Sequence, residues 1–187
     1  MKFTIKTDVL KKGLDIVNHA TASITTTPIL ENILIKVNFN SIVLTSNNLE
    51  MAIEHVISDD IEITTEWSFC IPSKLFTSYI SLVNEDKVDL ELLNDDSLLV
   101  KTLEWKVKIK WTQSSDFPLI PSIKEEVSLE LKWKIINKSV DKTLFSSAEW
   151  NIRPTLAWLL VNIDDKSVTF ASTDSFRLSE YKTEIDQ

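Results

Sequence analysis

The sequence has 187 residues, of which 43% are hydrophobic, and a formal net charge of −8 at pH 7. These values indicate a soluble globular protein of one large or two small domains and exclude a disordered acidic tail. A single cysteine, Cys70, excludes an internal disulfide and a cysteine-based zinc site. No apolar run is long enough for a signal peptide or a membrane span. We therefore expect a cytoplasmic protein, and no motif indicates a cofactor.

The composition is unusual in glycine and tryptophan. Average usage of about 7% would give a chain of this length roughly 13 glycines, but only Gly13 is present. Turns that need a positive φ normally use glycine, because other residues clash there. Either the turns form without glycine, or the tryptophan codons are UGA codons that the organism reads as glycine. The six tryptophans are Trp67, Trp105, Trp111, Trp133, Trp150 and Trp158.

The N-terminal part of the chain predicts a strand, a helix and two further strands. Residues 3–5 alternate as in a strand, and Thr7 or Asp8 is a suitable cap for the helix that follows. The next two strands are expected within residues 28–37 and at residues 42–46. The apolar residues of the helix recur at the spacing i, i+3, i+4, i+7, at Leu10, Gly13, Leu14 and Val17.

The segment from residue 53 to 126 predicts a second set of the same kind. Residues 68–71 form a short strand, and a helix then begins at Pro72 or Ser73. Residues 88–93 and 98–102 flank a turn and predict a hairpin, and residues 106–110 alternate as a further strand. The helix carries the apolar residues Leu75, Phe76, Tyr79, Ile80 and Val83. Two strand-helix-strand-strand halves predict an α+β fold.

The chain also contains an internal repeat. Residues 28–37 resemble residues 154–163, and residues 42–46 resemble 168–172, with every paired position differing by 126. The match needs no gap over about fifty residues, which chance similarity would not maintain. By this offset residues 127–131 are a strand, followed by a helix. We predict a complete first domain at residues 1–122 and a second at 123–187 that is truncated after its first half, so that the chain is an N-terminal fragment.

Six lysines lie on the predicted helices. On the helix of the second copy Lys134, Lys138 and Lys142 recur at i, i+4, i+8, opposite Ile136, Val140 and Leu144. One interpretation is an ordinary solvated face, and the other is a sequence-independent contact surface for nucleic-acid phosphates. The lysines of the first two helices are Lys11, Lys12 and Lys74.

The sequence offers no catalytic constellation. Its paired carboxylates, at 59–60, 85–86, 95–96 and 164–165, lie in contexts typical of turns, and no partner base accompanies them. We expect a protein that is not an enzyme. Two alternatives are a small α+β hydrolase that uses surface carboxylates and a monomeric peptide-binding module.

Several motifs together resemble the bacterial sliding clamp, the beta subunit of DNA polymerase III. Residues 27–34 are similar to the family's proline- and asparagine-containing signature, and 48–51 follow it at the expected place. Asp116-Phe117-Pro118 is similar to the end of the first clamp domain. Arg153-Pro154-Thr155-Leu156 and residues 173–178 resemble motifs of the second domain. The resemblance extends over the whole chain and about half of a family member.

The resemblance implies a DNA-clamp fold, with three similar domains in each of two chains that close a ring. Helices would line the hole and sheets would form the outside. A family member is a non-catalytic processivity factor that encircles double-stranded DNA without sequence specificity. Its implied partners are the replicative polymerase subunit, the clamp loader and other proteins with clamp-binding peptides. The third domain would be absent from this chain.

The resemblance also implies a pocket for partner peptides. The matching positions are Leu156, Thr173, Phe176, Arg177 and Leu178, and the remaining wall would come from residues that this chain lacks. Phe176 departs from the histidine or tyrosine that is usual in the family, and Ile24 replaces a loop residue that is often basic. Glycine is common in the family at the position of Trp158.

Overall fold

The computed structural model describes residues 2–22, 25–118, 120, 130–149 and 152–185. The chain divides into two compact units, unit 1 (Met1–Ser122) and unit 2 (Ile123–Gln187). Within the described ranges, no helix has the length and apolar content needed to cross a bilayer.

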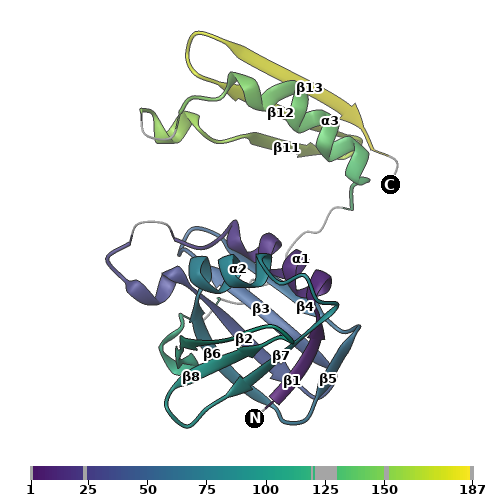
Figure 1. Ribbon diagram of the computed structural model, residues 1–187. Helices are drawn as coiled ribbons and strands as arrows, with labels where there is room; N and C mark the ends of the chain where they lie inside the picture. The colour runs from purple at the N-terminus through teal and green to yellow at the C-terminus, as the bar shows by residue number, and fades with distance from the viewer. Residues whose placement is uncertain (1, 23–24, 119, 121–129, 150–151, 186–187) are drawn as a thin grey trace. The chain divides into compact units, whose positions relative to one another are not determined.

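Unit 1 contains two antiparallel five-stranded sheets (Figure 1). The first has the order β5 (Ile61–Ile63), β1 (Lys2–Lys6), β7 (Lys87–Leu92), β8 (Ser97–Lys101) and β9 (Lys106–Lys110). The second has the order β10 (Thr112–Gln113), β6 (Trp67–Pro72), β2 (Asn32–Asn38), β3 (Ser41–Asn47) and β4 (Ala52–Ile57). The predicted strands at 68–71 and 106–110 and the predicted hairpin are confirmed.

The two halves of unit 1 exchange their first strands. In the second sheet β6 pairs with β2, and in the first sheet β1 pairs with β7, so each half contributes one strand to the sheet of the other. The strand order of one sheet becomes that of the other when each strand is exchanged with the strand five places away in the chain, β1 with β6, β2 with β7, β3 with β8, β4 with β9 and β5 with β10. The helices α1 (Thr7–Asn18) and α2 (Ser73–Ser81) lie side by side (Figure 1). The α+β fold of repeated strand-helix-strand-strand halves is therefore confirmed.

The apolar faces of both helices pack into one core between the sheets. Leu10, Leu14 and Val17 of α1 are buried as predicted, together with Phe76 and Ile80 of α2. Glycine at position 13 allows α1 to approach β3 and β4 closely. A Cβ on Gly13 would lie 2.9 Å from Leu44 Cδ1 and 3.1 Å from Ile57 Cδ1, so any larger residue requires these side chains to move.

The predicted cap of α1 is wrong. The capping position is Lys6, which makes no side-chain capping bond, and α1 begins at Thr7. The Thr7 side chain is buried, and its hydroxyl has no hydrogen-bond partner in the part of the chain that the structure describes. Strand β1 runs directly into the helix, and the backbone N–H of Thr7 donates to the carbonyl of Asp86 at 2.8 Å. Tertiary contact therefore replaces the local cap.

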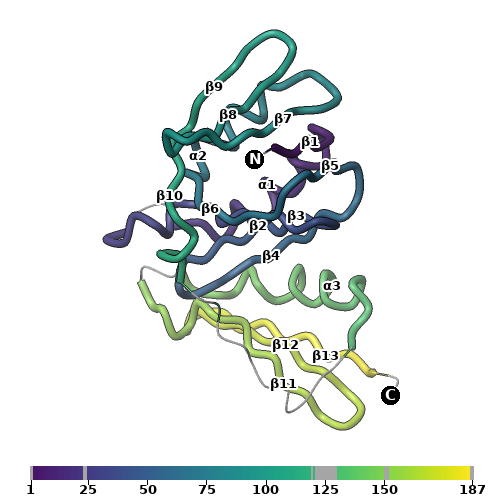
Figure 2. Tube along the Cα trace, turned by 90° about the horizontal axis from the view of Figure 1, so that it is seen from below, coloured from purple at the N-terminus to yellow at the C-terminus, as the bar shows by residue number. Residues whose placement is uncertain are grey.

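Among its described residues, unit 2 is a three-stranded antiparallel sheet with one α-helix on it. The order is β11 (Leu160–Asp164), β12 (Ser167–Thr173) and β13 (Leu178–Glu184), and α3 (Trp133–Thr143) packs on β12 and β13 (Figure 2). Of the strand predicted at 127–131, residues 127–129 lie outside the described residues, and Glu130 and Leu131 belong to no strand.

The structure repeats with the same offset of 126 residues that the sequence shows. Helix α3 starts at the counterpart of the first residue of α1, and β12 coincides with the counterpart of β3. A buried hydrogen bond is repeated as well. The hydroxyl of Ser46 donates to the carbonyl of Val17, and that of Ser172 donates to the carbonyl of Thr143 at 2.5 Å. The predicted repeat is thus confirmed down to single hydrogen bonds.

One part of the predicted α3 face is wrong. Leu144 follows the helix and is 46% exposed, whereas the small polar residues Ser139 and Thr143 are buried. Their hydroxyls donate to carbonyls one turn earlier, at 2.7 Å to Ile135 and 2.6 Å to Ser139. These bonds satisfy both hydroxyls within the helix, so the two small side chains can face the sheet without an unpaired polar group.

The described turns form without glycine. Positive φ values among the described residues occur at Leu49, Asp60, Asp96 and Ser175, and at none of the five described tryptophans. The expectation that tryptophan replaces a conformationally required glycine is therefore wrong for these five, and Trp150 lies outside the described residues.

The tryptophan codons can still be tested directly, since glycine can be used where it is not required. The single glycine of the chain and the glycine that is common in the family at the position of Trp158 are the remaining reasons to predict UGA at all six codons and glycine in the protein made by its own organism. Glycine at position 67 would remove the stacking of Trp67 on Phe69, whose ring centroids are 4.4 Å apart. Glycine at position 133 would remove little packing, because the Trp133 side chain is 72% exposed. Sequencing of the gene and mass spectrometry of native peptides check this. A UGG codon at one position would remove that position from the prediction, and UGG at all six positions would refute the prediction.

Candidate functional site

The lysines of unit 1 lie on both of its helices. Lys12 and Lys74 are exposed, whereas Lys11 is half-buried and its ammonium donates to the carbonyl of Val83 at 2.6 Å, just beyond the end of α2. Lys11 and Lys12 line a shallow cavity of about 270 Å³ with residues of α2. Helix α1 also carries two carboxylates, Asp8 and Asp15, and is electrically balanced.

Helix α3 of unit 2 is more basic. Lys134, Lys138 and Lys142 are all exposed and are accompanied by one carboxylate, that of Asp141. The ammonium of Lys138 lies 5.5 Å from the centroid of the Tyr181 ring, a cation–π distance that holds it beside β13. Lys134 and Lys142 make no ion pair within the described residues and are the more accessible cations of this helix.

The predicted peptide-pocket residues divide between two cavities. The first, of about 400 Å³, contains Leu156, Thr173 and Leu178. Its other lining residues come from the segment before β11, from β11 and from β12: Thr155, Trp158, Leu159, Leu160, Ala171 and Ser172. The lining is mostly apolar and is suited to aliphatic or aromatic side chains of a ligand.

The second cavity is smaller and charged. It has a volume of about 270 Å³ and contains the other two predicted residues, Phe176 and Arg177. It is also lined by Ser147, Ala148, Glu149, Ile152, Arg153 and Asp174. The turn between β12 and β13 lines the second cavity, and the two strand residues that flank this turn, Thr173 and Leu178, line the first. One short segment therefore links an apolar pocket with a charged one.

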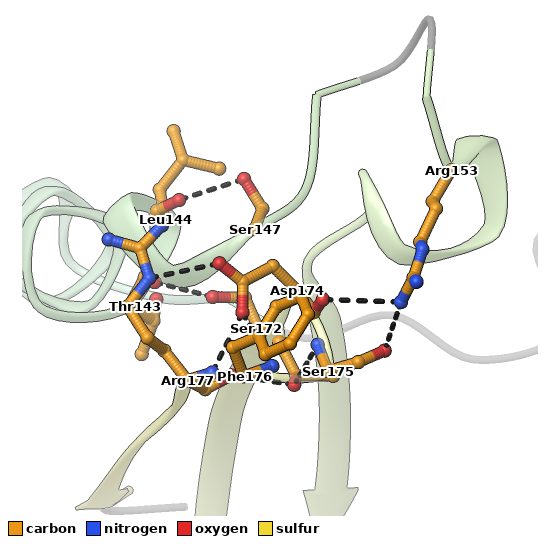
Figure 3. A network of polar contacts seen from close by, with 10 residues as sticks. Thr143, Leu144, Ser147, Arg153, Ser172, Asp174, Ser175, Phe176 and Arg177 are labelled. Carbon is orange, nitrogen blue, oxygen red and sulfur yellow. Dashed lines mark hydrogen bonds and ion pairs between the residues drawn. The ribbon is translucent and has the colours of Figure 1, made fainter.

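A polar network fixes this turn (Figure 3). The carboxylate of Asp174 accepts the backbone N–H groups of Phe176 at 2.9 Å and Arg177 at 2.7 Å, and also the Arg177 Nε at 2.9 Å. Ser175 has a φ of 77°, and its counterpart Leu49 in unit 1 has a φ of 73°. The turn is therefore a repeated feature of the fold, and in unit 2 it holds Arg177 in place.

Arg153 is a site residue that the sequence did not assign. Its Nη1 donates to the hydroxyl of Ser175 at 2.7 Å, and its guanidinium lies 6.0 Å from the centroid of the Phe176 ring (Figure 3). The Phe176 side chain is 90% exposed. The sequence feature that could have indicated Arg153 is the motif Arg153-Pro154-Thr155-Leu156, which also contains the predicted pocket residue Leu156. The arrangement offers two guanidinium groups and an exposed aromatic ring next to an apolar pocket.

The hydrogen bonds to Asp174 predict how the stability of this turn depends on pH. Hydrogen bonds from the backbone of Arg177 and Phe176, and then the Arg177 guanidinium, lower the pKa of Asp174 to about 2 from its ordinary 3.8. The ionised carboxylate therefore stabilises the turn above about pH 4, and this stabilisation is lost as the pH falls towards 2. An NMR titration of the Asp174 carboxyl should show its midpoint near 2. A midpoint near 4 would contradict the network, and Asp174→Asn should leave the amide shift of Arg177 insensitive to pH in this range.

The carboxylate pairs do not gather into a catalytic centre. Asp60 and Asp96 have positive φ values, as turn residues do, and Asp95 pairs with Lys108 at 3.0 Å. No group of three or more histidine, cysteine, aspartate or glutamate side chains is placed to hold a metal within the described ranges. Burial raises the pKa of the Cys70 thiol to about 12, so its thiolate is scarce at neutral pH.

Comparisons with known proteins identify both units. Residues 1–121 match the model of the DNA polymerase III beta subunit, N-terminal domain, and residues 130–187 match that of its central domain. The beta sliding clamp of Halalkalibacterium halodurans is 23% identical, and that of Proteus mirabilis is 29% identical. Each alignment covers 100% of this chain and 51% of the relative, so the chain spans about half the length of the relatives that it matches.

Solved structures support the same fold. The DNA polymerase sliding clamp of Bacillus subtilis superposes with a TM-score of 0.93 at 22% identity, covering 100% of this chain and 51% of that one. The beta subunit of DNA polymerase III from Thermotoga maritima superposes with a TM-score of 0.89 at 21% identity, covering 100% and 50%. At these identities the likeness concerns the fold, whereas the family models match most of the sequence. The chain belongs to the family of DNA polymerase III beta subunits, the sliding clamps, and matches the models of their N-terminal and central domains.

Proposed function

We propose that the chain acts as part of a sliding clamp, a non-catalytic ring around double-stranded DNA that tethers the replicative polymerase. The observation that carries this proposal is the consecutive match of two clamp domains to residues 1–121 and 130–187. The ring is a homodimer in the cytoplasm, and its remaining arc comes from outside these residues.

The contact with DNA is electrostatic and independent of sequence. Lys134 and Lys142 on α3 are exposed cations that can neutralise phosphates, while Lys11 is already engaged with the carbonyl of Val83. The lysine-bearing helices therefore do not contribute equally, and α3 supplies most of the attraction. A topological link tolerates such weak and mobile contacts, because retention does not depend on their strength.

The two cavities of unit 2 are the docking place for partner peptides from the polymerase and the clamp loader. An apolar peptide side chain fits the cavity beside Leu156 and Leu178. Arg153 and Arg177 lie at the neighbouring charged cavity, where they attract a carboxylate of the same peptide.

Retention on circular DNA tests the ring. The full-length protein that contains these residues is loaded on nicked circular duplex DNA with the clamp loader and passed through a gel-filtration column in moderate salt. We expect it to co-elute with the circle and to be released when one restriction cut makes the DNA linear. Equal retention on circular and linear DNA would show simple electrostatic binding and would overturn the ring. No retention on either form would overturn the clamp function of this chain.

A further inference from the structure

Carboxylates accompany the lysines on two of the three helices. Helices α1 and α3 hold five of the six lysines described above, and they also hold all the acidic residues of the three helices, namely Asp8, Asp15 and Asp141. Helix α2 has one lysine, Lys74, and no carboxylate. Because a carboxylate repels phosphate, these aspartates work against the proposed contact with DNA, and their positions show whether the fold needs them.

Asp8 has a structural explanation. It lies in the first turn of α1, where the positive end of the helix dipole stabilises a negative charge. The offset of 126 residues places Lys134 at the corresponding position of α3, so the negative charge is not repeated in the second copy. Asp8 therefore stabilises its own helix and needs no role in DNA binding.

Asp15 and Asp141 have no such explanation. They correspond to each other by the same offset, and both lie in the last turn of their helices, where the dipole disfavours a negative charge. Both residues are exposed, and neither forms an ion pair within the described part of the chain. The two carboxylates therefore destabilise their helices in both copies, with no ion pair to compensate.

The two aspartates share the helix surface that carries the lysines. Each follows a lysine by three positions, Lys12 in α1 and Lys138 in α3, and residues at this spacing are neighbours on the surface of a helix. In unit 1, Lys12 and Asp15 line the same shallow cavity beside α2. A phosphate that approaches either lysine therefore meets a carboxylate at a similar distance.

We propose that Asp15 and Asp141 limit the strength of the contact with DNA, so that the clamp moves along the duplex easily. This inference rests on the proposed function, in which the lysine-bearing helices face DNA. Each phosphate contact must break before the protein can advance, so stronger contacts would slow the movement. A ring is retained by its topology and loses nothing when its contacts are weak. The two aspartates thus set mobility and leave retention unchanged.

Neutralising both aspartates tests this role. The full-length protein that contains these residues is made as wild type, as Asp15→Asn/Asp141→Asn and as the control Asp96→Asn/Asp165→Asn. The control makes the same change in charge at exposed residues of two hairpin loops, one in each unit. Repulsion between two unit charges about 7 Å apart in water changes an affinity about threefold, so the first variant should bind a short linear duplex about tenfold more tightly at low salt. The difference should shrink as salt screens the charges.

Diffusion along DNA measures the mobility itself. The three proteins are placed with the clamp loader on long duplex DNA with blocked ends and followed by single-molecule fluorescence. The Asp15→Asn/Asp141→Asn variant should diffuse several-fold more slowly than the wild type, and the control should match the wild type. Equal diffusion of all three would overturn the proposal, as would a control that slows equally, because net charge would then explain the effect. Wild-type protein that is not retained on circular DNA would instead refute the proposed function, and the role of the aspartates with it.

Thermal unfolding separates this role from a structural one. Asparagine removes an unfavourable charge from the last turn of each helix, so the midpoint of thermal unfolding should stay the same or rise. A lower midpoint for Asp15→Asn/Asp141→Asn would show that the two carboxylates stabilise the fold, and would overturn their assignment to mobility on DNA.

Discussion

Reversing the charge of Lys134, Lys138 and Lys142 to glutamate is expected to weaken duplex binding strongly and to flatten its dependence on salt. Each lysine that neutralises a phosphate adds about one unit to the slope of log K against log salt, so the triple variant should lower the slope by about 3. Because the ammonium of Lys138 lies over Tyr181, its single variant should lose less than that of Lys134 or Lys142. Fluorescence anisotropy of labelled duplex DNA over a salt series measures the slope.

The chain offers a control with the same change in charge. Lys106, Lys108 and Lys110 lie on β9 and are exposed, but they belong to a sheet and not to a helix. Their triple glutamate variant should bind duplex DNA with a nearly unchanged salt slope. If both triple variants lose the same affinity, net charge alone explains the binding, and the helix surface has no special role.

Local patterns sufficed for much of the fold. The alternation of lysine with apolar residues predicted β9 at residues 106–110, the bounds that the structure has. The gapless offset of 126 residues predicted a second unit, and the fold repeats even the hydroxyl bonds of Ser46 and Ser172. Such features depend on periodicity and on spacing, which a sequence displays directly.

Features that depend on distant contacts were missed. The capping preference of Thr7 yielded to a backbone bond with Asp86, far along the chain. Helical periodicity placed Leu144 on the buried face of α3, but in unit 1 the counterpart position Asn18 contacts α2, which belongs to the other half. A helical wheel cannot tell whether an apolar residue faces its own sheet or a second layer.

The candidate site, too, was predicted only where local motifs sufficed. The motif resemblance led to Leu156, Thr173 and Leu178, which line one cavity, but it did not separate them from Phe176 and Arg177 at the other. Arg153 and Ser175 are joined by a hydrogen bond across 22 positions, which no local pattern encodes. Pairing between β11 and β12 brings Leu160 opposite Ala171 at the apolar pocket, and this register became known only from the fold.

Truncation of Phe76 should have the largest effect on stability. The Phe76 side chain is fully buried on α2, in the core that Leu14 of α1 shares, so alanine leaves a cavity between the two halves of unit 1. Removal of a buried phenylalanine side chain costs about 3–5 kcal/mol. Since Phe76 belongs to the second half and packs in a core common to both, the loss should appear in one cooperative transition of unit 1. Urea denaturation followed by circular dichroism measures it.

The matched control is Phe39→Ala, because Phe39 is 64% exposed and its removal should change the free energy of unfolding by less than about 0.5 kcal/mol. A loss below about 1.5 kcal/mol for Phe76→Ala would mean that the core collapses easily around the missing ring. Two separate transitions would mean that each half of unit 1 folds alone. Exchange of β1 and β6 between the sheets argues against that outcome, because neither half retains its complete sheet without the other.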